Sequence, residues 1–171
     1  MQVFSSLKQS RRKKSLPIFD YPFFYMWHIV LQSQTKIEEA IKPLGLTPIE
    51  WRIIYTLYDF EDMSIRELSG FILIEASVLS RMLQKLEERK IVVKKKRNKD
   101  QRYVIVQLSP KGLKIYDEVI PIVIRQLNIA QANIPETDLL HQLNTLKTMM
   151  GNVYRSPFAF GVDVDKSMEV I

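Results

Sequence analysis

The chain lacks cysteine and has little histidine or glycine, and each scarcity removes a class of function. With no Cys among 171 residues, disulfides, thiolate metal sites and thiol-based redox sensing are excluded. The two histidines, His28 and His141, lie far apart in the sequence, so a metal-binding spacing is absent. The five glycines are isolated and form no phosphate-binding loop. No convergent set of titratable groups suggests catalysis, so we expect neither an enzyme nor a cofactor.

Long apolar runs are missing as well. No run reaches the length needed to span a bilayer. The basic start of the chain has no apolar core behind it before Pro17, which argues against a secretory signal. The composition, 46% hydrophobic and 26% charged, is that of an ordinary globular protein. We therefore predict a cytoplasmic protein with a core of one domain, or of two small layers.

Positive charge is unevenly distributed along the chain, whose net charge is +6. Residues 81–102 contain ten Lys and Arg against three Asp and Glu, and the segment 8–14 adds five basic residues. All other residues together carry a net charge of −6. A mildly acidic body with one basic stretch and one basic tail suggests that a single face meets a polyanion.

Apolar periodicity and capping signals predict a mainly α (α+β) chain. Apolar residues at helical spacing predict a long amphipathic helix that stops at Pro43. Thr47 with Glu50, and Ser64 with Glu67, have the spacing of capping boxes, which begin helices. Helices are expected over 23–41, from 47 to about 58, from 64, over 77–90, from 109 to about 131 with a kink at Pro121, and over 135–150.

Two strands, over 91–96 and 103–108, are predicted with a turn centred on Asn98. Val104, Val106 and Leu108 share one face and are expected to anchor this ribbon to the core. A helix-turn-helix followed by a ribbon is a winged helix.

The predicted regions are a basic flexible N-terminal arm over 1–20, a helical dimerisation region over 21–45 and 109–152, a winged helix-turn-helix over 46–108, and a C-terminal tail over 153–171.

The helix over 77–90 has one apolar and one polar face. Its polar face carries Ser77 and Ser80 near the start, followed by Arg81, Gln84 and Lys85. Small hydroxyls allow close approach to a duplex, while Arg81 can fork onto guanine O6 and N7 and Gln84 can pair with adenine N6 and N7. A solvated helix face gives the same pattern. The short helix before it and the charged ribbon after it favour DNA.

Positive charge is concentrated at the tip of the predicted ribbon. A two-stranded tip is thin enough to enter the minor groove, where Arg is favoured, and flanking lysines such as Lys94 would contact phosphates. Asp100 lies two residues from Arg102 and could hold its guanidinium in one orientation. A solubilising hairpin that protects an edge strand is the alternative. The predicted wing contacts are Lys95, Lys96, Arg97, Asn98, Lys99, Asp100 and Arg102.

The run DQRYVIVQLSPKG over 100–112 fits the pattern D-x-R-x-x-x-V-x-L-[ST]-x-x-G. With IREL over 65–68 and SVLSR over 77–81, it makes the segment 46–112 resemble the MarR (multiple antibiotic resistance regulator) family of bacterial winged-helix transcription factors. The resemblance implies that 77–90 is the recognition helix, that Arg102 is the wing arginine with Asp100 as its partner, and that the outer helices form an obligate homodimer. Val78 stands where a small polar residue is common, so an apolar contact, such as one to a thymine methyl, is expected there.

The function implied is a sequence-specific regulator of double-stranded DNA, a repressor that binds a near-palindromic operator as a homodimer. Its location would be the bacterial cytoplasm, and the nucleoid when it is bound to DNA. We also predict a DNA-backbone contact from Ser64. The alternative is an architectural or non-specific nucleic-acid-binding winged helix without an effector.

Members of the MarR family often sense phenolic compounds or aromatic carboxylates in a cleft between the dimerisation helices and the winged domain. The resemblance therefore implies a small aromatic or phenolic effector that releases the operator. Candidate ligand residues are Trp27, His28, Tyr55 and Arg66. Each also has a structural explanation: the two aromatics as core residues, His28 as a buried imidazole with satisfied hydrogen bonds, and Arg66 as a phosphate contact.

Overall fold

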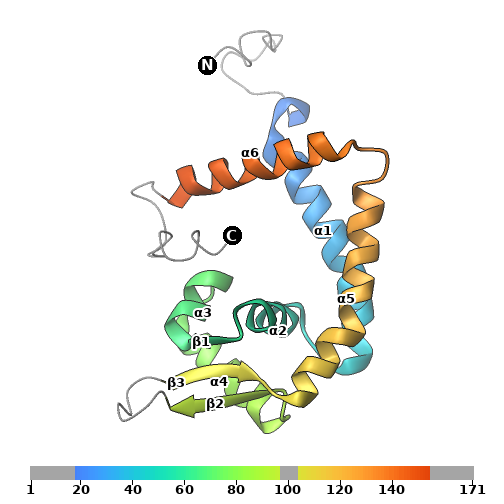
Figure 1. Ribbon diagram of the computed structural model, residues 1–171. Coiled ribbons are helices and arrows are strands. Elements are labelled where there is room, and N and C mark those ends of the chain that lie inside the picture. The colour runs from blue at the N-terminus through green and yellow to red at the C-terminus, as the bar shows by residue number, and fades with distance from the viewer. Residues whose placement is uncertain (1–17, 97–103, 155–171) are drawn as a thin grey trace.

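Helices make up most of the computed structural model, which describes residues 18–96 and 104–154 (Figure 1). The long helices α1, α5 and α6 lie outside a winged-helix region formed by α2, α3, α4 and three short strands. The elements in chain order are η1 Ile18–Asp20, α1 Pro22–Ile41, η2 Lys42–Leu44, α2 Pro48–Phe60, β1 Asp62–Ser64, α3 Ile65–Ile72, α4 Ala76–Glu88, β2 Val92–Lys96, β3 Val104–Leu108, α5 Pro110–Ala130 and α6 Glu136–Tyr154.

The long helices α1, α5 and α6 lie above the winged region in the view of Figure 1. α1 and α5 pack side by side, and α6 turns back from the far end of α5 toward the start of α1 (Figure 1). The winged region sits at the opposite end, where α1 ends and α5 begins. None of the described helices combines the length and the apolar content needed to cross a bilayer.

The sheet has three antiparallel strands in the order β1-β3-β2, with β3 in the centre. Val106 of β3 is paired with Met63 of β1 on one side and with Lys94 of β2 on the other. The prediction of a two-stranded ribbon was therefore incomplete. β1 is only three residues long and lies in the acidic segment after α2, which is too short to show the alternation typical of a strand.

The predicted capping boxes are confirmed. The Thr47 hydroxyl accepts from the backbone N–H of Glu50 (3.3 Å), and the Glu50 carboxylate accepts from the Thr47 N–H (2.8 Å). Ser64 and Glu67 make the same reciprocal pair at 3.2 and 2.8 Å. Ser109 caps α5, with its hydroxyl accepting from the N–H of Lys111 and Gly112. Local side-chain chemistry thus determines where three of the helices begin.

The core lies in the winged region and extends only to the near ends of α1 and α5. Val106 is fully buried and Leu108 packs against the core, as predicted for the inner face of β3, while Val104 is half-buried. Towards their far ends α1, α5 and α6 expose large apolar side chains: Phe23, Trp27, Ile29, Val30, Leu31, Ile124, Leu127, Ile129, Leu140, Leu143, Leu146, Met150 and Val153. These side chains are called the open apolar face below.

α4 ends two residues earlier than predicted for the helix over 77–90, in a Schellman motif. The N–H of Ile91 donates to the Leu86 carbonyl (2.8 Å) and the N–H of Lys90 to the Glu87 carbonyl (2.8 Å). Lys90 has φ +60°, a left-handed conformation that glycine adopts without a steric cost. Its side chain is exposed, so nothing in the core depends on it.

Replacing Lys90 by Gly is expected to raise the free energy of unfolding by about 0.5–1 kcal/mol, because the relief of the left-handed strain exceeds the added entropy of the unfolded chain. Urea unfolding followed by circular dichroism measures the change. The matched control is Lys85→Gly within α4, which should lower stability by about 1 kcal/mol. A destabilised Lys90→Gly protein would show that the left-handed residue carries no strain.

Candidate nucleic-acid interface

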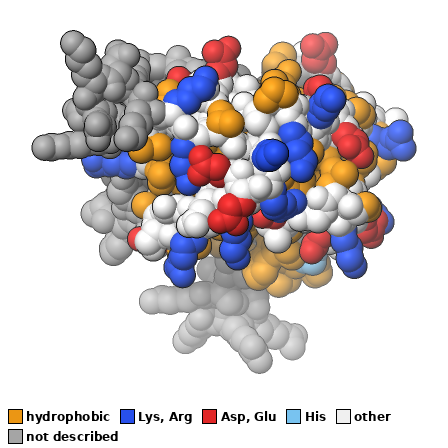
Figure 2. Space-filling view, turned by 90° about the horizontal axis from the view of Figure 1, so that it is seen from below, with side chains coloured by type: hydrophobic (Ala, Val, Ile, Leu, Met, Phe, Trp, Pro, Cys, Tyr) orange, Lys and Arg blue, Asp and Glu red, His pale blue; other side chains and the backbone are white. Residues whose placement is uncertain are grey.

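α4 presents to solvent a face that is polar except at Val78. All six side chains predicted to read or approach DNA are exposed on it: Ser77, Val78, Ser80, Arg81, Gln84 and Lys85. The opposite face holds Leu79, Leu83 and Leu86, which are fully buried. Figure 2 views the molecule from the winged-helix end and shows Lys and Arg side chains interspersed with Asp and Glu. α4 is thus held in place by its buried leucines, while the opposite face remains accessible to solvent.

Glu75 is the N-cap of this helix, a role that the sequence interpretation missed. Its carboxylate accepts from the N–H groups of Ser77 (3.0 Å) and Val78 (3.2 Å), and from the Ser77 hydroxyl. The hydrogen bond from Ser77, then that from Val78, holds the pKa of this carboxyl below its usual value. Ser, Thr, Asp and Asn are the preferred caps, so the sequence suggested a helix that begins at Ser77 rather than at Ala76.

The two predicted base readers lie along the surface of their own helix. Arg81 Nε donates to the Ser77 carbonyl at 3.5 Å, and Gln84 Nε2 donates to Glu88 at 3.2 Å. Both contacts are exposed, so they cost little to exchange for contacts with a duplex. Each side chain must rotate away from the helix before it can reach a base edge.

The wing begins in β2 and its tip lies outside the described residues. Lys95 is exposed. Lys94, for which we expected a phosphate contact, instead pairs with Glu87 of α4 (2.9 Å) and is only 23% exposed. Its charge is therefore already balanced, and the phosphate role is not favoured. The side chain of Lys96 and the predicted contacts Arg97, Asn98, Lys99, Asp100 and Arg102 are not among the described residues.

Ser64, the predicted backbone contact, is half-buried where β1 meets α3. Its oxygen accepts from the N–H of Glu67 as the N-cap. A hydroxyl can donate one hydrogen bond while it accepts another. A phosphate oxygen approaching the start of α3 could therefore still be bound by Ser64.

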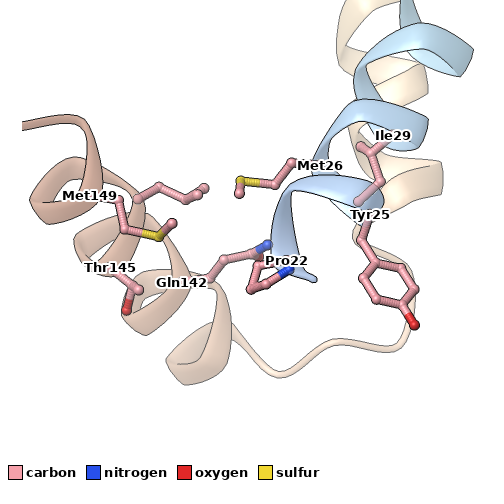
Figure 3. A pocket seen from close by; sticks show the side chains of 8 residues that line it. Pro22, Tyr25, Met26, Ile29, Gln142, Thr145 and Met149 are labelled. Atoms are coloured by element: carbon pink, nitrogen blue, oxygen red, sulfur yellow. The ribbon is translucent and has the colours of Figure 1, made fainter. Parts of the chain in front are cut away.

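The structure places the four candidate ligand residues on three different helices. Trp27 (67% exposed) and His28 lie on α1, with the His28 ring 4.4 Å from that of Phe24. Tyr55 lies on α2, and Arg66 is exposed on α3. A cavity of about 320 Å³ between α1 and α6 contains none of them. Figure 3 shows its lining, which includes Met26 from α1 and Gln142 and Met149 from α6.

Tyr55 belongs to an aromatic cluster between α2 and α5. The rings of Tyr58 and Tyr116 are stacked with centroids 3.5 Å apart, and Trp51 and Tyr55 lie 5.9 and 6.2 Å from Tyr116. Burial, and then the negative charge of Asp59, raises the pKa of Tyr55 above its usual value. The Tyr55 phenol therefore stays protonated at neutral pH and can donate a hydrogen bond.

Comparison with known proteins identifies the same region. A family model described as the MarR family matches residues 46–104. The uncharacterized HTH-type transcriptional regulator YsmB of Bacillus subtilis is 30% identical over 93 residues, 54% of this chain, and the match covers 64% of the length of YsmB. The match thus links the chain to a transcriptional regulator over less than two thirds of that protein's length.

Two solved structures are similar in fold. A transcriptional regulator of the MarR family from Silicibacter pomeroyi has a TM-score of 0.77 at 24% identity, covering 85% of this chain and 100% of that one. NadR in complex with 4-hydroxyphenylacetate has a TM-score of 0.70 at 21% identity, covering 82% of this chain and 96% of that one. The predicted winged helix-turn-helix with long flanking helices is confirmed.

Proposed function

We propose that the chain is a regulator of the MarR family, a sequence-specific repressor that binds double-stranded DNA as a homodimer on a near-palindromic operator. The observation that carries this proposal is the open polar face of α4. It offers two hydroxyls, a guanidinium, an amide and an ammonium between Ser77 and Lys85, while its apolar side is buried in the core. A helix fixed in this way fits the major groove.

The proposed contacts divide into base reading and positioning. Ser77, Val78 and Ser80 lie in the first turns of α4, where recognition helices meet base edges, and Arg81 and Gln84 would fork onto guanine and adenine. Lys85 and Ser64 would bind phosphates. The remaining proposed contacts are those of the wing: Lys95, Lys96, Arg97, Asn98, Lys99 and Arg102 in the flanking minor groove, with Asp100 orienting Arg102.

The open apolar face supports the proposed homodimer. Monomeric proteins seldom expose a contiguous apolar surface of many large side chains. Here such side chains recur along α1, α5 and α6, away from the winged region. A second copy that covers them would place two recognition helices on one side of the dimer, about one helical turn of DNA apart. Sedimentation analysis of the purified chain distinguishes a dimer from a monomer.

The effector proposal rests on the structural neighbour NadR, whose complex contains 4-hydroxyphenylacetate. Trp27, His28, Tyr55 and Arg66 are proposed to contact a small aromatic ligand. The Tyr55 phenol can donate to such a ligand, but Asp59 lies close enough to raise its pKa, so a ligand carboxylate should bind away from this end. A thermal-shift screen of phenolic acids and neutral phenols tests the proposal, since a ligand specific to the folded state raises the unfolding temperature.

Selection of bound duplexes from a random pool tests DNA recognition directly. The repressor proposal expects an enriched near-palindrome with two half-sites. Binding without any enriched sequence would instead support the alternative, an architectural winged helix that binds nucleic acid through charge alone.

Gln84→Ala and Arg102→Ala should separate base reading from charge. Gln84→Ala is expected to reduce the preference for the selected duplex over a scrambled one, because a good bidentate base contact contributes about 1–3 kcal/mol of discrimination. Arg102→Ala is expected to weaken binding to both duplexes and to reduce the salt dependence. Gel-shift titrations at two salt concentrations measure these effects. Equal losses on both duplexes for Gln84→Ala would remove its reading role.

A further inference from the structure

One side chain, Arg89, ties the end of α4 to the connection between α1 and α2. Its Nη1 contacts the Glu50 carboxylate at 3.0 Å. Its Nη2 donates to the Gly45 carbonyl at 2.9 Å and to the Leu44 carbonyl at 3.3 Å. The guanidinium fork thus binds three oxygens that lie 39 to 45 residues away in sequence. They belong to the segment that leads from the long helix α1 into the winged region.

The acceptor Glu50 is itself held in place. It is only 7% exposed, and its second oxygen accepts from the N–H (2.8 Å) and the hydroxyl (3.1 Å) of Thr47. Gly45, whose carbonyl Arg89 binds, has φ +67° and ends the short helix after α1. Arg89 is therefore bound to a rigid turn, and a buried carboxylate bonded on both sides leaves its guanidinium little freedom.

The same end of α4 is joined to α5. The Lys111 ammonium donates to the Arg89 carbonyl at 3.0 Å, and the Ser109 hydroxyl donates to the Lys90 carbonyl at 2.6 Å. Both donors lie at the start of α5. The last turn of the recognition helix is consequently bonded to the elements that continue into both long helices. These bonds are distinct from the apolar contacts of Leu79, Leu83 and Leu86, which hold the body of α4 in the winged region.

We propose that Arg89 is a positioning residue that fixes the recognition helix relative to the long helices, and so fixes the separation of the two recognition helices in a dimer. The proposal rests on the homodimeric function proposed above. Once one recognition helix of the dimer has bound its half-site, binding of the second half-site is intramolecular. The effective concentration of the second recognition helix at its half-site depends on how rigidly the two helices are connected. Arg89 supplies stiffness through a planar fork that a lysine cannot reproduce.

Arg89→Lys separates this role from charge and from base contact. The exchange keeps the positive charge but loses the fork, so affinity for a duplex with both selected half-sites should fall roughly tenfold or more. Affinity for a duplex with a single half-site should change by less than about twofold, since no base contact is altered. Insertion of one base pair between the half-sites should lower the DNA affinity of the variant less than that of the wild type. A less rigid connection between α4 and the long helices tolerates a changed spacing of the half-sites.

The matched control is Arg125→Lys, the same exchange on an exposed position of α5, which should leave all three affinities unchanged. Glu50→Gln removes the other half of the ion pair and should reproduce the pattern if Arg89→Lys folds poorly. Equal losses on single and paired half-sites, or no loss on either, would overturn the positioning role. A wild-type chain that selects no paired half-sites would instead overturn the proposed function.

Discussion

Replacing Gly112 by Ala is expected to lower the free energy of unfolding by about 3 kcal/mol or more, because there is no room for a side chain. A Cβ at this position would lie 2.3 Å from the Ile91 carbonyl oxygen and 3.1 Å from a methyl of Leu108. The Ile91 carbonyl cannot easily withdraw, since it accepts from the Ser109 N–H at 3.0 Å. The start of α5 would have to move away from the sheet.

Gly45→Ala is the matched control for this prediction. Gly45 requires a left-handed backbone, but a Cβ there would meet only Arg89 Nη2 at an ordinary 3.7 Å. Its cost should be limited to the backbone strain of about 1–2 kcal/mol. Urea unfolding of the two variants measures both costs. If Gly112→Ala were no more destabilised than Gly45→Ala, the approach of α5 to Ile91 would have to be looser than the structure shows.

Arg81→Ala is expected to cause the largest loss of sequence-specific DNA affinity. A bidentate contact to guanine contributes about 1–3 kcal/mol, and a homodimer makes each contact twice, so the loss on a selected palindrome should be about 2–6 kcal/mol. The free protein loses little, since Arg81 makes an exposed 3.5 Å contact with the Ser77 carbonyl on its own helix and only a minor electrostatic interaction with Glu75. Stability should therefore stay unchanged while affinity falls.

Lys85→Ala provides the comparison, because it removes the same charge from the same face of α4. A phosphate contact carries no sequence information, so this variant should lose affinity equally on selected and scrambled duplexes. Fluorescence anisotropy titrations with both duplexes measure the two patterns. If Arg81→Ala and Lys85→Ala behaved alike, Arg81 would be a phosphate contact and the reading of guanine would have to come from elsewhere.

Local signals in the sequence predicted most of the helices and the exposed face of α4. The capping boxes at Thr47 and Ser64 depend on residues three positions apart, so their chemistry is visible in the sequence. Apolar spacing within α4 was enough to separate the buried leucines from the exposed Arg81 and Gln84. These parts of the fold and of the site need no knowledge of distant contacts.

The features that the sequence did not predict depend on distant partners or on unusual residues. β1 is recognisable only through its pairing with β3, more than forty residues later. The contact between Arg89 and Glu50 spans 39 residues and has no local signature. Glu75 was missed because glutamate is not a common N-cap. The resemblance to the MarR family suggested ligand contacts at Trp27 and Tyr55, but a resemblance in sequence does not place their two helices relative to each other.

The Glu75 cap has a consequence for the thermodynamics and the rate of the proposed DNA binding. The first amides of α4 are already bonded to this carboxylate, so the helix is complete in the absence of DNA. A segment that folds only upon binding must be ordered at that moment and shows a large negative heat-capacity change. Formation of α4 should therefore contribute nothing to the heat-capacity change on DNA binding, and it should not limit the association rate.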